Sequence, residues 1–229
     1  MGFGSLFFGY FLLLNIAYYG YTDMIAALIM AMALNKLSSV NASFKSGFFV
    51  SMAFAAVGLF ELVISFMDMF SPSNGYLDLL DYAMIPRTVA IAILTLFILK
   101  GIDEVASEVG LSDLARRAKI SMTAVLIIYG LETVLNIPIE YSGVILKILS
   151  VIAVFVIFST FVIVTINLIT IYRAYMKICM PEDVDNDIPD KPSRFEFINK
   201  HREHTKDRQR EYAEYRLEKF KKKNSKKKK

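Results

Sequence analysis

Six strongly apolar stretches follow one another along the sequence, and short polar stretches separate them. They cover residues 3–19, 24–37, 46–67, 77–99, 120–135 and 144–172. The last stretch contains a run, residues 149–172, without a single charge. About 20 apolar residues in a helix are enough to cross a hydrocarbon core about 30 Å thick. The pattern therefore predicts an all-α, polytopic integral membrane helix bundle.

The number of spans depends on the first two stretches, because both are short. Residues 20–23 form the break between them. Two separate spans give six in total, and one interrupted span gives five. In the fourth stretch, Pro86 lacks a backbone N–H and crowds the preceding turn, so we expect the helix to bend or to begin there.

Basic residues favour six spans. Lys36 and Lys45 lie in one connecting segment, and Arg116 and Arg117 lie in another. With six spans, both segments are on the same side as the C-terminal tail, and the three remaining loops contain no lysine or arginine. Short loops rich in lysine and arginine prefer the cytoplasm. We therefore expect both termini in the cytoplasm and the protein in the plasma membrane, whereas five spans would place the N-terminus outside.

The loops on the opposite side carry acidic residues, which we interpret as ordinary solvated loop acids. They are Asp23, Asp68, Asp78, Asp81 and Glu140. The alternative is an acidic mouth that raises the local concentration of cations. On the cytoplasmic side, residues 101–119 form the longest connecting segment, and we expect a short connecting helix there with its N-cap at Ser112.

The net charge of +4 conceals an uneven distribution along the chain. Residues 1–180, the membrane body, carry ten Lys or Arg and eleven Asp or Glu. Residues 181–193 form an acidic linker, and residues 194–229 carry fifteen Lys or Arg against six acids. The pattern Ser193-x-x-Glu196 is typical of a helix N-terminus. We expect a charged cytoplasmic helix from about residue 194 to residue 221, followed by a disordered lysine tail.

Three ionisable residues lie deep within the apolar stretches: Arg87, Glu132 and Glu61. Charged residues inside membranes are rare and usually face the protein interior. At about 1.5 Å per residue, Arg87 lies roughly 20 Å from Lys100, and Glu132 lies equally far from Lys119. We expect Arg87 to pair first with Glu132 and second with Glu61. A structural clamp is the favoured interpretation, and a substrate or ion-coupling site is the alternative.

The lysines at the end of the tail would attract phosphate groups. Anionic lipids and RNA share this chemistry, so either is a candidate partner. The residues concerned are Lys221, Lys222, Lys223, Lys226, Lys227, Lys228 and Lys229.

Motifs for catalysis or cofactor binding are absent from the sequence. The two histidines, His201 and His204, lie in the tail, and no cysteine or carboxylate completes a metal site with them. We therefore expect a non-enzymatic protein without cofactor or metal. The favoured function is organising or regulating a membrane complex, through membrane-protein partners and the basic tail. The alternatives are a small transporter or channel using the Arg87, Glu132 and Glu61 cluster, and an insertase-like protein with a ribosome-facing tail.

Overall fold

The computed structural model describes residues 2–13, 20–70, 74–137 and 143–178. These residues contain no strand, and nearly all of them belong to helices, which confirms the all-α architecture. The helices are α1 (Gly2–Leu12), α2 (Gly20–Leu37), α3 (Ala42–Phe70), α4 (Asn74–Glu108), α5 (Ser112–Leu135) and α6 (Gly143–Ile178). The packing described below concerns residues 2–175, which group together as one compact unit. The linker, the tail helix and the lysine tail expected from the sequence lie outside the described residues.

Four helices are long and apolar enough to cross a membrane, which supports an integral membrane protein. The segments are Ala42–Phe70, Tyr82–Glu108, Ser112–Leu135 and Lys147–Ile178. At about 1.5 Å per residue, the 11 residues of α1 reach only about 17 Å. That length is short of a core about 30 Å thick. The expected six spans are therefore supported for α3, α4, α5 and α6.

Large apolar side chains cover the outside of the bundle. Phe155 and Phe158 on α6 are 74% and 69% exposed, and Phe66 on α3 is 61% exposed. A water-soluble protein rarely exposes apolar surface so extensively. These side chains are suited to lipid tails, and this supports the assignment of α3 and α6 as membrane spans.

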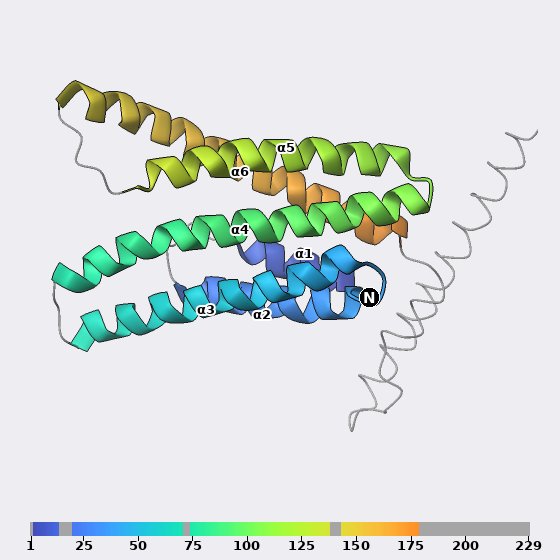
Figure 1. Cartoon of the computed structure of the whole chain (residues 1–229), viewed down its shortest axis with the longest axis horizontal. Helices are drawn as coiled ribbons and strands as arrows, with labels where there is room; N and C mark the ends of the chain where they lie inside the picture. The colour runs from blue at the N-terminus through green and yellow to red at the C-terminus, as the bar shows by residue number, and fades with distance from the viewer. Residues whose placement is uncertain (1, 14–19, 71–73, 138–142, 179–229) are drawn as a thin grey trace, which may run out of the picture. The chain divides into compact units, whose positions relative to one another are not determined.

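Helices adjacent in sequence are adjacent in space from α1 to α5. Figure 1 shows α4 lying between α3 on one side and α5 on the other. Helix α6 packs on α4 and α5, since Ile163 belongs to a buried cluster with Leu99, Val125 and Tyr129. It also meets α1, where the rings of Phe7 and Tyr172 lie 5.9 Å apart. Helices α1 and α6, which are far apart in the sequence, are thus in contact.

Two glycines allow neighbouring helices to approach closely. A Cβ at Gly9 on α1 would lie 2.7 Å from Met30 Cγ of α2. A Cβ at Gly101 on α4 would lie 2.5 Å from Cε1 of Phe44 on α3. Both distances are shorter than van der Waals contact, so a larger residue at either position would push the helices apart.

The connecting segment between α4 and α5 differs from the expectation. Only Val109, Gly110 and Leu111 separate the two helices, and Gly110 has φ of +76°. The expected separate connecting helix is therefore wrong, because residues 101–108 continue α4 and α5 begins at Ser112. Ser112 is the first helical residue rather than the N-cap, which is Leu111.

Polar contacts join α3, α4 and α5 at this end of the bundle. Ser43 Oγ donates a hydrogen bond to Glu104 Oε2 at 2.6 Å. Lys119 Nζ lies 3.8 Å from Asp103 Oδ2. The exposed basic residues Lys45, Lys100 and Arg116 belong to the same three helix ends, so lysine and arginine gather where the sequence predicts a cytoplasmic surface.

Helix α4 continues through Pro86 without ending. A helix start at this residue, one of the two expectations, is therefore excluded. A bend stays a prediction. Pro86 itself lines a shallow apolar hollow with side chains of α3 and α4, among them Phe60 and Tyr82.

Candidate functional site

Arg87 forms an ion pair with Asp23. Arg87 Nη2 on α4 lies 2.6 Å from Asp23 Oδ2 on α2. Asp23 is only 3% exposed, which corrects its interpretation as a solvated loop acid. The residue lies in the first turn of α2, where the helix dipole favours a negative charge. This partner was not predicted from the sequence, because residues 20–23 were expected to form a loop.

Glu61 is buried on α3 and belongs to the same charged region. Its side chain interacts electrostatically with both Arg87 and Asp23. The structure therefore brings acidic residues of α2 and α3 near the arginine of α4. The predicted Arg87, Glu132 and Glu61 cluster acquires a further member, Asp23, which contacts the guanidinium directly.

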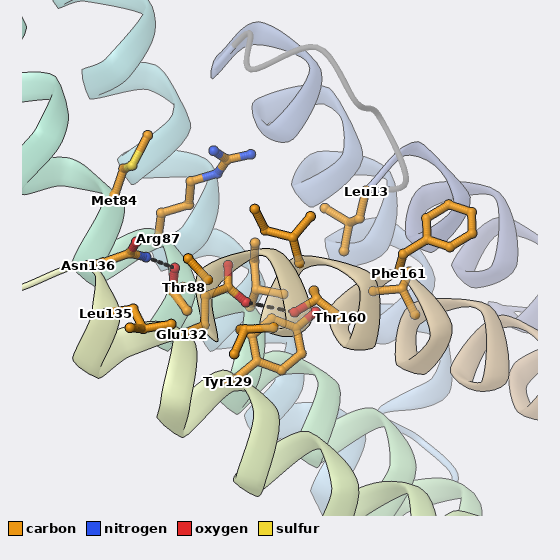
Figure 2. A pocket seen from close by; sticks show the side chains of 15 residues that line it. Leu13, Met84, Arg87, Thr88, Tyr129, Glu132, Leu135, Asn136, Thr160 and Phe161 are labelled. Carbon is orange, nitrogen blue, oxygen red and sulfur yellow. Dashed lines mark hydrogen bonds between the residues drawn. The ribbon is translucent and has the colours of Figure 1, made fainter. Parts of the chain in front are cut away.

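Glu132 has a different environment. Thr160 Oγ1 on α6 donates a hydrogen bond to Glu132 Oε2 at 3.1 Å. Figure 2 shows the Glu132 carboxylate turned toward Thr160 and the Arg87 guanidinium directed away from it. The charge of Arg87 still acts on Glu132. The two residues thus influence each other electrostatically, while the contact made by Glu132 in the described structure is with a hydroxyl group.

A pocket of about 320 Å³ lies between α4, α5 and α6, and both Arg87 and Glu132 line it (Figure 2). Its polar lining comes from all three helices and from the residue that follows α5. The walls between these polar groups are apolar. The polar lining residues are Arg87, Thr88, Tyr129, Glu132, Asn136 and Thr160, and the apolar ones are Leu13, Met84, Ile91, Leu135, Ala153, Val156, Ile157, Phe161 and Val164.

Asn136 joins α5 to α4 at the rim of this pocket. The residue is the C-cap of α5, and its Nδ2 donates a hydrogen bond to Thr88 Oγ1 at 3.3 Å. From the sequence, Asn136 is expected in an outer loop, without a role. A single asparagine next to an apolar stretch carries no signal of this contact, because the contact depends on how α4 and α5 are rotated.

A second buried polar cluster lies beyond the pocket. Tyr10 Oη on α1 is 3.1 Å from Thr95 Oγ1 on α4, and Asn167 Nδ2 on α6 donates to Tyr10 Oη at 3.0 Å. All three side chains are buried, and Asn167 Oδ1 has no hydrogen-bond partner among the described residues. Tyr129, which lines the pocket, interacts electrostatically with Tyr10. The two polar regions are therefore neighbours.

Other predicted site residues lie outside the described residues. These are the tail lysines 221–223 and 226–229, so their contact with lipid or RNA stays a prediction. Within the described ranges, no three His, Cys, Asp or Glu side chains come together in a way that could bind a metal ion.

Comparisons with known protein families, with curated proteins and with solved structures gave no match to this chain.

Proposed function

We propose that this chain is a non-enzymatic plasma-membrane protein that binds a small solute in the pocket between α4, α5 and α6, and passes the solute across the membrane. The observation that carries the proposal is the pocket itself, a cavity of about 320 Å³ among membrane-spanning helices that is lined by Glu132, Arg87 and Asn136. Among the functions that the sequence leaves open, this one corresponds to a small transporter.

The energetic cost of placing ionisable side chains in a membrane supports a functional role for these polar groups. Ionisable side chains in a bilayer are expensive, and they usually mark substrate or ion pathways. A close-packed clamp would leave no volume beside Glu132, whereas the pocket volume is at the lower end of the range typical of small-molecule sites, about 300–1,000 Å³. The geometry therefore favours solute binding over a purely structural role for Glu132.

The neighbouring polar cluster supports passage across the membrane. Thr95 lies two helical turns from Thr88 along α4, about 10 Å closer to the helix end that carries Lys100. Tyr129 lines the pocket and interacts electrostatically with Tyr10. We propose that a solute leaving the pocket follows this sequence of polar groups toward the cytoplasm. With six spans and cytoplasmic termini, the pocket would open toward the outside.

Cysteine accessibility tests this proposal. The chain has one cysteine, Cys179, and a Cys179→Ser background lets single cysteines be introduced on α4. Met84→Cys would place a thiol in the pocket, and Val89→Cys would place one on the exposed apolar side of the same helix. A permanently charged methanethiosulfonate, added to intact cells, should modify Met84→Cys and leave Val89→Cys unmodified.

Two outcomes of this experiment would contradict the proposal. If Met84→Cys does not react from either side of the membrane, the pocket is closed to water-soluble molecules. If it reacts only in inside-out vesicles, the orientation predicted from the basic residues is wrong and the pocket faces the cytoplasm.

A second candidate function concerns the basic tail. The excess of lysine and arginine in residues 194–229 supports docking to anionic lipids, by which the protein would organise a membrane complex. At about 1 kcal/mol per basic residue near the surface, several lysines are enough for strong attraction. Binding of a peptide of residues 194–229 to anionic and neutral liposomes should differ strongly, and equal binding to the two would contradict lipid docking.

A further inference from the structure

Two ionisable side chains, Arg87 and Glu132, line the pocket, and their charges are compensated to different degrees among the described residues. Arg87 has a carboxylate partner, Asp23, at 2.6 Å, and its guanidinium is directed away from Glu132 (Figure 2). Glu132 receives a hydrogen bond from the neutral hydroxyl of Thr160. Among the described residues, no lysine or arginine nitrogen lies within ion-pair distance of Glu132. The pocket therefore presents a carboxylate whose charge is only partly compensated.

This imbalance decides which charge a ligand would carry. A carboxylate in an apolar, water-poor environment is costly unless it is paired. A cationic group beside Glu132 would provide the missing partner and would form a charge-assisted hydrogen bond. An anionic ligand would meet the opposite situation, because Arg87 Nη2 already pairs with Asp23 and Glu132 would repel the ligand.

The other walls of the pocket indicate what the rest of the ligand resembles. Leu135 on α5 and Val156, Phe161 and Val164 on α6 give the pocket a largely apolar lining. Phe161 also provides an aromatic ring, and aromatic faces attract cations as well as apolar groups. The volume of about 320 Å³ limits the ligand to a small molecule.

We propose that the ligand is a small organic cation, with its ammonium group at the Glu132 carboxylate and its hydrocarbon part against Phe161 and the apolar residues of α6. This inference rests on the proposed solute-binding function and gives it a substrate class. Glu132 is thereby the residue that determines specificity for charge, and Thr160 positions its carboxylate.

Three probes of nearly equal size test the inference: 2-phenylethylammonium, 2-phenylethanol and phenylacetate. Their binding to the full-length protein in lipid nanodiscs is measured by equilibrium dialysis. The cation should bind at least about tenfold more tightly than the alcohol or the anion, because only the cation pairs with the carboxylate. Glu132→Gln should remove this preference, and Glu132→Asp, which keeps the charge, should retain most of it.

A matched control comes from Glu108, which is exposed at the other end of α4. Glu108→Gln makes the same chemical change outside the pocket and should leave the affinity of the cation within about twofold of the wild type. Size-exclusion profiles of all variants in nanodiscs show whether each one folds. If Glu132→Gln does not fold, the inference is tested with the wild type and Glu132→Asp. Both should bind the cation more tightly than the alcohol and the anion.

The outcomes distinguish failure of this inference from failure of the proposed function. If the wild type binds the alcohol or the anion as tightly as the cation, or if a folded Glu132→Gln keeps the preference, the pocket binds a solute but the cationic class is wrong. If none of the three probes binds the wild type, solute binding in this pocket and the cationic class are both contradicted.

Discussion

Asp23 and Arg87 connect α2 to α4 through an ion pair with 2.6 Å between Oδ2 and Nη2. The carboxylate is almost completely buried, and the arginine lies on the helix that occupies the middle of the bundle. Arg87 and its neighbour Thr88 also line the pocket that contains Glu132. The ion pair therefore holds one wall of the proposed solute site against the rest of the bundle.

A double-mutant cycle tests the energetic role of this ion pair. Arg87→Gln would remove the ion pair of the buried Asp23 carboxylate, and breaking a buried ion pair typically costs about 3–5 kcal/mol. We expect Asp23→Asn and Arg87→Gln each to lower the free energy of unfolding by an amount of that order. The double variant should be no less stable than the worse single variant. Reversible unfolding in mixed micelles provides the measurement.

Glu132 provides the control for this cycle. Because the guanidinium is directed away from Glu132, the coupling between Arg87→Gln and Glu132→Gln should be weaker than that between Arg87→Gln and Asp23→Asn. Coupling between Arg87 and Glu132 as strong as that between Arg87 and Asp23 would contradict the structural account and would favour the partner expected from the sequence.

The hydrogen bonds of Tyr10 should contribute measurably to stability. Tyr10→Phe removes the hydroxyl group that contacts both Thr95 and Asn167. Hydrogen bonds between membrane helices contribute about 0.6 kcal/mol on average. We expect a loss of about 1 kcal/mol in the free energy of unfolding, because two bonds disappear. Tyr82→Phe is the matched control, since Tyr82 is 59% exposed, and equal losses for the two variants would contradict a role for this cluster.

Helix packing at Gly101 should be sensitive to one added methyl group. In Gly101→Ala the new Cβ would meet the ring of buried Phe44 at 2.5 Å. Overpacking of this kind typically costs about 1–3 kcal/mol. Gly130→Ala on α5 is the control, because no atom lies within 4 Å of a Cβ at that position. Gly130→Ala should stabilise the protein slightly through helix propensity, and a stable Gly101→Ala variant would show that α3 and α4 are not so closely packed.

The hydropathy pattern predicted where the helices cross the membrane better than where they end. The stretch 120–135 and α5 (Ser112–Leu135) end at the same residue, but α5 begins eight residues earlier. Polar residues at membrane surfaces do not stop a helix, and apolar stretches show only the part that lies in lipid. For the same reason, residues 101–119 were expected to form a connecting region, whereas most of them belong to the ends of α4 and α5.

Depth along the helices was predictable from the sequence, but their rotation was not. Arg87 and Glu132 are both thirteen residues from a basic residue of the connecting segments, and this suggested that they pair. Asp23 is also thirteen residues from Lys36, so the same counting could have identified it had residues 20–23 been taken as helical. Which of two acids at one depth meets the arginine depends on helix packing, and no local sequence pattern encodes it.

If the pocket between α4, α5 and α6 holds a transported solute, a large side chain that fills the pocket should block transport. Ala153→Phe would place a ring inside the pocket, whereas Val154→Phe would place one on the exposed side of the same helix, where Val154 is 53% exposed. The measurement is uptake of radiolabelled 2-phenylethylammonium into proteoliposomes that contain each variant. Our account predicts that Ala153→Phe reduces uptake about tenfold or more and that Val154→Phe matches the wild type. Equal uptake by the wild type and a folded Ala153→Phe variant would contradict it.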